Sequence, residues 1–190
     1  AIPVDGSYLG GTTQYEKRNL AFEVPVWNPD LCIQCGQCSI ICPHSVIRAK
    51  SYDATLLENA PDGFQSAPVN ARGYPDKRYT LEIAVEDCTG CGLCVDHCPA
   101  HDPLEHSVKA LNFMPRQPQV EQGRRTLAFF DSLPEHRRQE VDLHQARGLQ
   151  FVRPLFEFSG ACAGCGETPY LKILSQLFGD RLQIANATGC

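Results

Sequence analysis

The fold of this chain is decided by the stretch C-I-Q-C-G-Q-C-S-I-I-C-P, which runs from Cys32 to Pro43. Cys88 to Pro99 repeats the pattern as C-T-G-C-G-L-C-V-D-H-C-P. Each run places three cysteines at a spacing of three, then a fourth cysteine that is followed by proline. This is the spacing of bacterial 4Fe–4S ligands, and in two-cluster ferredoxins the fourth cysteine of a run serves the other cluster. The two runs therefore predict a ferredoxin-like domain with two 4Fe–4S clusters.

The crossed arrangement assigns four cysteines to each cluster. The first cluster is expected to take three ligands from the first run and one from the second: Cys32, Cys35, Cys38 and Cys98. The second cluster is expected to take the remaining set: Cys88, Cys91, Cys94 and Cys42. Gly36, Gly90 and Gly92 lie within the runs, where positive φ lets backbone N–H groups approach cluster sulfides.

Two other uses of clustered cysteines fit these runs less well. Zinc sites use two separated ligand pairs with four ligands per ion, which a repeated three-plus-one pattern does not match. Disulfide scaffolds belong to small secreted proteins, whereas thiolate clusters need a reducing compartment, so we expect a cytoplasmic protein. Because each cluster already has four cysteines, the nearby histidines are expected to be surface or packing residues. They are His44, His97, His101 and His106.

Length and charge narrow the class of protein. The chain has 190 residues, enough for one or two domains with a real core. Its formal net charge of −5, to which clusters would add negative charge, argues against nucleic-acid binding. No apolar run reaches the length of a membrane span, so no membrane partner is expected. The sequence starts with Ala1 and stops at Cys190 inside an apparent motif, which predicts a piece of a longer polypeptide.

Four regions are expected along the chain. They are an extended N-terminal segment (1–25), the ferredoxin-like domain (26–118), a linker with a helix (119–150) and the start of a further, truncated domain (151–190). The charged residues Glu16, Lys17 and Arg18 are expected to form a surface patch, with a docking contact to another part of a longer chain as the alternative.

Periodicity and turn signals predict the elements of the ferredoxin-like domain. Strands are expected at Val46–Ala49 and Tyr79–Val85, the second of which alternates clearly. The Gly- and Pro-rich stretch 60–77 between them predicts an ordered insertion loop that shields a cluster from solvent. A short helix is expected at Leu104–Leu111.

The linker region contains one helix signal and one interruption. Ser132-Leu133-Pro134-Glu135 has the form of a capping box with proline in the first turn. It predicts a helix from Leu133 to Ala146, with Gly148 as its natural stop. The prolines and glycine between Met114 and Gly123 predict that no regular element crosses that region.

The C-terminal region carries a third cysteine group, F-S-G-A-C-A-G-C-G-E-T-P-Y, from Phe158 to Tyr170. Thr168-Pro169 predicts the start of a helix with an apolar face, and Gly179 predicts its end. A strand is expected at Arg181–Ala185, followed by a turn at 186–190. This order of loop, helix and strand belongs to an α/β domain and not to a ferredoxin.

Cys162 and Cys165 form a lone C-x-x-C pair, whose spacing leaves several uses open. It could be half of a zinc site, or a redox dithiol beside a helix N-terminus, where the pKa of a thiol is lowered. It could equally belong to a third 4Fe–4S cluster with Cys162, Cys165 and Cys190 as ligands and a fourth ligand beyond Cys190. The context of the motif, and not the motif, decides between these.

Taken together, these stretches resemble the pyruvate:ferredoxin (flavodoxin) oxidoreductases. The resemblance rests on Y-E-K-R at 15–18, W-N-P-D-L-C-I-Q-C-G-Q-C at 27–38, the long insertion, the stretch 158–170 and I-A-N-A-T-G-C at 184–190, and it covers essentially the whole chain. It implies an α+β chain: a two-cluster bacterial ferredoxin-like domain with an insertion, then a linker, then the opening loop–helix–strand unit of an α/β thiamine-diphosphate-binding domain. The family's chain is several times longer, so most of the catalytic machinery is expected to lie outside this one.

The resemblance also implies roles for the third cysteine group. Cys162, Cys165 and Cys190 would supply three ligands of a cluster next to thiamine diphosphate. Glu167 and Cys190 would line that cofactor, which is bound with Mg²⁺ in the full enzyme. Glu167 has a second interpretation, as a first-turn helix residue favoured by the helix dipole.

The family's reaction is the function that the resemblance implies. Pyruvate is oxidatively decarboxylated with coenzyme A to acetyl-CoA and CO₂, and electrons pass through three 4Fe–4S clusters to ferredoxin or flavodoxin. The enzyme is expected to be a homodimer. The alternatives are a free-standing ferredoxin-like carrier with a redox extension and a zinc-stabilised interaction module. A free carrier needs no loop–helix–strand unit, which favours the enzyme.

Overall fold

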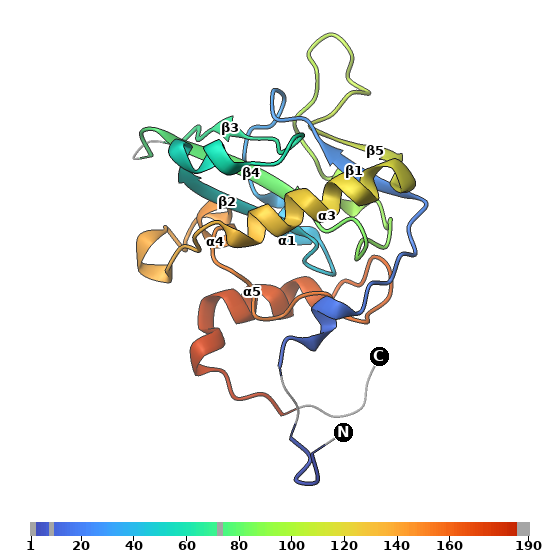
Figure 1. The fold of residues 1–190 in the computed structure, drawn as a ribbon, viewed down its shortest axis with the longest axis vertical. Coiled ribbons are helices and arrows are strands. Elements are labelled where there is room, and N and C mark those ends of the chain that lie inside the picture. Colours follow the sequence, from blue (N-terminus) through green and yellow to red (C-terminus); the bar gives the residue numbers. More distant parts are fainter. Residues whose placement is uncertain (1–2, 8–9, 72–73, 186–190) are drawn as a thin grey trace.

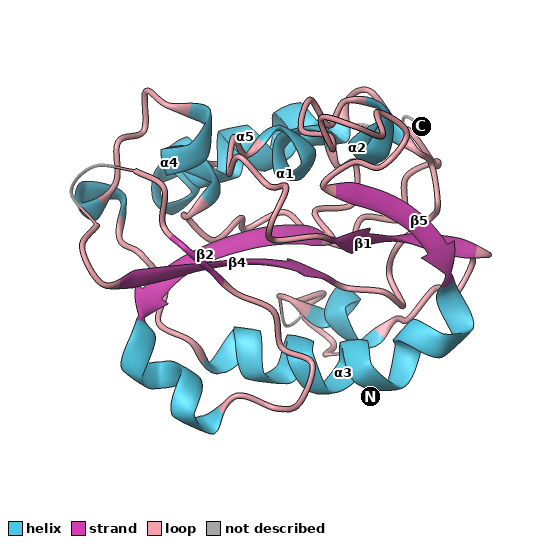
Figure 2. Ribbon diagram, turned by 90° about the horizontal axis from the view of Figure 1, so that it is seen from above, coloured by secondary structure: helices cyan, strands magenta, loops and turns pink. Residues whose placement is uncertain are grey.

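The computed structural model describes residues 3–7, 10–71 and 74–185. Two small antiparallel sheets form a central layer, with helices on both faces (Figures 1 and 2). Helices α1, α2, α4 and α5 lie on one face and the long helix α3 on the other, as Figure 2 shows. None of the helices in the described part of the chain has the length and apolar character that a bilayer crossing requires.

One sheet has two strands and the other has three. In the first, β1 (Glu23–Trp27) pairs with β5 (Leu111–Pro115). In the second, the order is β2 (Ile47–Asp53), β4 (Lys77–Ile83) and β3 (Ala67–Pro68). The strands expected on either side of the insertion are thereby confirmed, each shifted by one or two residues or extended. The β1–β5 pair was not predicted, because prolines within these edge strands hide the strand pattern.

The helices are short except for α3 and α5. They are α1 (Gln37–Ile41), α2 (Leu93–Asp96), α3 (Arg116–Ser132), α4 (Ala146–Gln150) and α5 (Thr168–Phe178). Four 3₁₀ turns join them in the described residues: Thr12–Tyr15, Ala54–Asn59, Arg138–Glu140 and Gly179–Arg181. The prediction of a mixed α and β fold is confirmed in this coarse form.

An aromatic cluster lies between the sheets and the helices α1, α2, α4 and α5. The rings of Trp27 and Tyr79 meet edge to face at 5.8 Å, and Phe151 approaches Tyr79 at 6.1 Å. All three residues are buried. Burial of large aromatic side chains supplies much of the apolar area that holds a domain of this size together.

The predicted helix at 133–146 is wrong. Ser132 and Leu133 end a helix here and do not start one, because Pro134 disfavours a helical conformation at Leu133. The ammonium of Lys50 completes this end by donating to the carbonyls of Phe130 and Leu133 at 2.8 and 2.7 Å. The stretch 133–145 contains only the 3₁₀ turn at 138–140, and Ala146 begins α4.

The predicted interruption between Met114 and Gly123 is also wrong, because β5 runs directly into α3 there. Pro115 lies just before the helix and Pro118 lies in its first turn. Backbone N–H groups in a first turn have no partner within the helix, so a proline costs little there. Gly123 lies inside α3, where a Cβ would come within 2.9 Å of Val85 Cγ2. The glycine thus allows close packing and does not break the helix.

Three smaller predictions fail for local reasons. Residues 104–110 form a loop and not a helix, since Asp102 accepts the N–H groups of Leu104 and Glu105, and Leu111 begins β5. Gly148 lies within α4 and not after a helix. It packs closely on Asp142, so that a Cβ there would lie only 2.1 Å from Asp142 O. The strand expected at 181–185 is absent, and within the described residues no strand lies beside this stretch to pair with it.

Helix α5 has the predicted bounds, with Gly179 as its C-cap. Its polar side is buried and its apolar side is not. The buried residues are Thr168, Lys172, Ser175 and Gln176. The exposed apolar residues are Tyr170, Leu171, Leu174 and Phe178. The division of the chain into four regions remains a prediction.

Glu82 is a buried carboxyl on β4 that faces α3, where the Thr126 hydroxyl donates to its Oε1 at 2.7 Å. Burial raises the pKa of Glu82 from 4.5 to about 7, against the Thr126 bond, and Asp131 adds to the rise. The folded state therefore binds this proton more tightly than the unfolded chain. The free energy of unfolding must fall as the pH rises from about 4.5 to about 7.

We predict that Glu82→Gln removes this loss, because glutamine still accepts from Thr126 and does not ionise. The variant should gain on the order of 3 kcal/mol over the wild type at pH 8, at about 1.4 kcal/mol per pH unit, and less at pH 5.5. Denaturant unfolding of the cluster-loaded chain at the two pH values measures the gain. Glu121→Gln removes the same charge from an exposed position of α3 and should change little. An equal gain at both pH values would contradict the prediction.

Candidate metal centre

Four cysteines from both runs line one cavity of about 350 Å³. Cys88, Cys91 and Cys94 come from the second run, and Cys42 comes from the end of the first. Helix α2 carries Cys94, and Cys42 is the C-cap of α1. Two runs that are far apart in sequence therefore share one cavity.

A second cavity, of about 340 Å³, mirrors the first. Cys32, Cys35 and Cys38 line it together with Cys98, the last cysteine of the second run. The structure thus brings together the same two sets of four that the crossed pattern predicts. Ligation of a cluster by each set remains a prediction.

The loops around the cavities have the backbone conformation expected of them. Positive φ values occur at Gly36 (78°), Gly90 (68°) and Gly92 (88°). Gln34 takes the position in the first run that Gly90 takes in the second, and its φ is 56°. At these two positions the backbone N–H donates to the first cysteine of the run, Gln34 to Cys32 Sγ and Gly90 to Cys88 Sγ, both at 3.4 Å. Such N–H donors stabilise a thiolate ligand and tune its metal.

The insertion between the runs is bonded to the loop of the first run, which lines the second cavity. The Gln34 side chain donates to Pro68 O at 2.7 Å and accepts the Asn70 N–H at 3.0 Å. Asn70 Nδ2 donates in turn to Ile33 O at 2.8 Å. These bonds place the insertion over the first run, in agreement with the shielding role expected of it.

Burial controls the protonation of the cavity thiols. It raises the pKa of Cys88 to about 11 and also raises the pKa values of Cys32, Cys38 and Cys94. Buried thiolates need positive charge close by, and metal binding to such thiols releases protons. The cavities therefore suit a ligand that carries its own positive centres.

The spacing of the sulfurs also bears on what the cavities hold. Across residues 3–7, 10–71 and 74–185, no three His, Cys, Asp or Glu side chains converge as a single metal ion requires. The cysteines surround cavities and do not meet at a point. A four-iron cube, which offers each cysteine a separate iron, fits this arrangement better than a zinc ion does.

The third cysteine group lies against the first cavity. A Cβ built on Gly164 would lie 3.9 Å from Cys91 Cβ, so the loop between Cys162 and Cys165 touches a cysteine of the second run. Cys162 is exposed and Cys165 is partly buried. The backbone N–H groups of Thr168 and Glu167, at the start of α5, lower the pKa of Cys165. Cys165 is therefore set up as a thiolate ligand or nucleophile.

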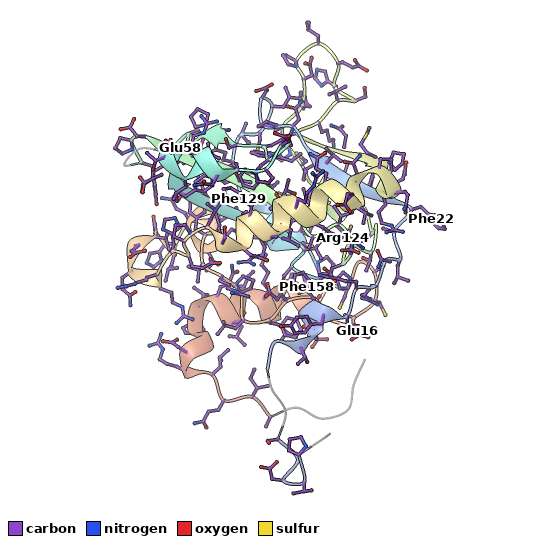
Figure 3. All side chains as sticks on the ribbon, viewed as in Figure 1. Glu16, Phe22, Glu58, Arg124, Phe129 and Phe158 are labelled. Carbon is purple, nitrogen blue, oxygen red and sulfur yellow. The ribbon has the colours of Figure 1, made fainter. Side chains whose placement is uncertain are left out.

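The N-terminal segment holds this loop in place; Figure 3 labels Glu16 of the segment and Phe158, which precedes the loop. Arg18 Nη1 donates to the carbonyls of Ser159 and Ala161 at 3.2 Å each. Lys17 Nζ lies 2.6 Å from Asp87 Oδ2 and 5.3 Å from the centre of the Phe158 ring. Glu16 and Lys17 remain exposed, as expected of a surface patch, whereas the half-buried Arg18 is engaged in contacts within this chain. Charge runs were assumed to be solvated, and these carbonyls were not visible in the sequence.

Glu167 is exposed and precedes α5 at its N-cap position, where its side chain makes no capping bond. This placement fits the helix-dipole interpretation and leaves its carboxylate open to solvent. Cys190, the remaining residue assigned to the third cluster and the cofactor, lies outside the described residues. So does the turn expected at 186–190.

Sequence reasoning gave His44 no specific place in the site. Its ring is buried, lines the first cavity and lies with Nδ1 3.1 Å from Ser159 O. Burial lowers the pKa of His44. His97, His101 and His106 are exposed, so all four histidines are surface or packing residues, as expected. Only the position of His44 directly after the Cys42-Pro43 pair hinted at this contact.

Comparison with protein families identifies the class of the cluster-binding part. Residues 31–101, which hold both cysteine runs, match the 4Fe–4S dicluster domain. This match supports 4Fe–4S clusters as the groups that the cavities hold.

Particular relatives follow from comparison of the whole chain. It is 52% identical over 190 residues to a pyruvate-flavodoxin oxidoreductase of Trichormus variabilis. It is 45% identical over 188 residues to a pyruvate:ferredoxin oxidoreductase of Moorella thermoacetica, and 43% identical over 191 residues to a pyruvate-flavodoxin oxidoreductase of Rhodospirillum rubrum. These alignments cover 98–100% of the chain. They confirm the resemblance that the motifs indicate.

The chain spans a small part of these relatives. It covers 16% of the length of the Trichormus and Rhodospirillum proteins and 15% of the Moorella protein. The similarity therefore describes one segment of a much longer kind of polypeptide.

We predict that the crossed cavities can be separated by a reciprocal pair of substitutions. Cys42→Ala should remove the EPR signal of the cluster held by Cys88, Cys91 and Cys94 and leave the other cluster in place. Cys98→Ala should do the reverse, because each cube loses a ligand from the distant run. EPR of the two reduced variants, with iron analysis, measures the effect. Loss of the cluster of its own run in either variant would show that ligation is not crossed.

Proposed function

We propose that this chain is the electron-relay portion of a pyruvate (2-oxoacid):ferredoxin or flavodoxin oxidoreductase. The enzyme would oxidatively decarboxylate pyruvate with coenzyme A to acetyl-CoA and CO₂. The chain would pass the electrons through 4Fe–4S clusters to ferredoxin or flavodoxin, in a reducing compartment. The names of the relatives support this proposal.

One observation carries the proposal. Two cavities of nearly equal size are each lined by three cysteines of one run and the last cysteine of the other. Neighbouring cubes built from such crossed sets lie close together, and short separations favour electron transfer. We propose Cys32, Cys35, Cys38 and Cys98 as ligands of one cube and Cys88, Cys91, Cys94 and Cys42 as ligands of the other.

The third cysteine group gives the relay a direction. Its loop approaches Cys91 of the first cavity, and Ser159, just before that loop, contacts His44, which lines the same cavity. A third cluster held by Cys162, Cys165 and Cys190 would therefore pass electrons first to the cube of Cys91. The cube of Cys32 would be the outer station, beside the half-exposed Ile33.

Residues 151–190 would begin a thiamine-diphosphate-binding domain. The diphosphate cofactor, bound with Mg²⁺, supplies the carbon chemistry that releases electrons from pyruvate. Glu167 and Cys190 would line it, and the exposed carboxylate of Glu167 is free to do so. The exposed apolar side of α5 supports a covering layer of further polypeptide, because contiguous apolar patches mark contact surfaces. We expect the complete enzyme to be a homodimer.

We predict that anaerobic reconstitution loads the chain with about eight iron and about eight acid-labile sulfide ions, as two cubes of four require. Iron, sulfide and zinc analysis of the purified chain measures this. A chain that holds zinc without sulfide would overturn the relay and leave the zinc-stabilised interaction module.

The proposed order of the clusters gives a separate prediction for an enzyme that carries this chain. When pyruvate and coenzyme A are added to the Cys98→Ala enzyme, the cube of Cys91 should still become reduced. The rate of flavodoxin reduction should fall to a small fraction of the wild-type rate. Cys42→Ala should stop electrons before either cube of the ferredoxin-like domain. Rapid-freeze EPR shows which cube is reduced first. Faster reduction of the Cys32 cube than of the Cys91 cube in the wild type would reverse the order.

A further inference from the structure

Lys172 projects from α5 into the interior beneath the cysteine runs. Its side chain is 1% exposed. The ammonium donates to Ser39 Oγ at 3.1 Å and also to Ser39 O. A buried lysine is unusual, because taking its charge out of water costs several kcal/mol unless an opposite charge lies nearby.

A second buried lysine shows what such a residue normally finds. Lys50 is equally buried, and its ammonium lies 2.9 Å from Glu135 Oε1. In the described part of the chain, Lys172 forms no ion pair with Asp or Glu, and Ser39 alone receives its hydrogen bonds. The charge of Lys172 therefore lacks the carboxylate that Lys50 has.

The position of Ser39 identifies the missing negative charge. Ser39 lies on α1 between Cys38 and Cys42, which line different cavities. Burial lowers the pKa of Lys172 to about 8, while negative charge at Cys42, Cys38 and Glu157 opposes that shift and Arg48 adds to it. At pH 7 the side chain remains largely protonated. Its ammonium is thus held beside Ser39, on the helix that carries one cysteine of each cavity.

The proposed clusters would supply the counter-charge. Four thiolates outweigh the positive charge of a 4Fe–4S cube, so each ligated cube is negative, and reduction adds one more electron. A fixed positive charge nearby stabilises the reduced state more than the oxidised state. Net charge and burial around a cluster are among the factors that set its reduction potential.

A buried network fixes the ammonium at this point. Ser39 Oγ lies 2.9 Å from Gln150 Oε1, and Gln150 Nε2 donates to Gln176 Oε1 at 3.3 Å. Gln176 Nε2 donates to Val152 O at 2.7 Å. The network joins α1, α4 and α5 and explains why the polar side of α5 faces inward. A cation held by such a network cannot swing away from the cubes.

We propose that Lys172 is the shared buried counter-ion of the two 4Fe–4S clusters and raises the reduction potentials of both. This inference rests on the proposed function. Lys172 belongs to the same helix that follows the third cysteine group, so docking of that segment onto α1 sets the potentials of the two cubes. It is a tuning residue and touches no reacting atom.

The test is a dithionite titration of the reconstituted chain at pH 7, followed by EPR. Each cube accepts one electron from the reductant. In Lys172→Gln, which is neutral and still able to donate a hydrogen bond, the one-electron equilibrium of both cubes should shift at least about tenfold toward the oxidised state. That shift is about 59 mV to more negative potential for a one-electron couple. Lys172→Met should shift it in the same direction, and Lys172→Arg should stay within about twofold of the wild type.

Lys50→Met is the matched control. It also removes a buried lysine, but one that points toward α3, on the face of the sheet opposite α1 (Figure 2). Its cluster potentials should stay within about twofold of the wild type in the same equilibrium. A shift equal to that of Lys172→Gln would mean that any buried lysine matters, and would overturn the assignment.

The remaining outcomes separate this inference from the proposed function. Wild-type chain without iron and sulfide would refute the relay itself. Wild-type chain with two cubes, and unchanged potentials in Lys172→Gln, would refute only the counter-ion. A further outcome is that the neutral variants lose their cubes while Lys172→Arg keeps cubes of wild-type potential. This would support the counter-ion, because the positive charge would then be needed for the cubes to assemble. Loss of the cubes in Lys172→Arg as well would assign Lys172 a role of shape and overturn the proposal.

Discussion

The crossing of the two cysteine runs is the constraint on which the rest of the structure depends. Cys42 leaves the first run and lines the cavity of the second, and Cys98 does the reverse. Helices α1 and α2, which lie just before Cys42 and Cys98, must therefore lie side by side over one face of the sheets (Figure 2). Because each cavity needs both runs, neither half of the domain can form its site alone, and cluster binding is coupled to folding.

Next to the cysteine runs, buried polar contacts position the C-terminal segment, a role that apolar packing has in most domains. Helix α5 buries Lys172 and Gln176 and leaves Tyr170 and Leu174 exposed. Buried polar groups hold a unique arrangement only when their hydrogen bonds are satisfied, and a satisfied network specifies position more narrowly than apolar contacts do. The C-terminal segment is therefore registered on α1 by hydrogen bonds, while its apolar side remains available to other polypeptide.

The predictions that succeeded rest on local chemistry. Thiolate spacing and positive-φ glycines identify the cluster loops, and the proline after Thr168 together with Gly179 marks both ends of α5. The predictions that failed involve prolines and glycines whose meaning depends on a neighbour. Pro134 ends α3 and does not follow a cap, and Gly123 admits the side chain of Val85. The same residue can break a helix or permit close packing, and only the neighbour decides which.

By itself, the sequence predicts the class of site, because thiolates at these spacings are typical of 4Fe–4S ligands and suit few other metals. Its motifs also indicated the resemblance to pyruvate:ferredoxin (flavodoxin) oxidoreductases, which alignment of the whole chain with such a relative confirms. Only the tertiary structure decided which cavity the third cysteine group approaches, what Lys17 and Arg18 hold, and where the charge of Lys172 lies. These are contacts between residues separated by about a hundred positions or more in several cases. Local periodicity carries no record of them, because they depend on how the elements pack and not on how each one forms.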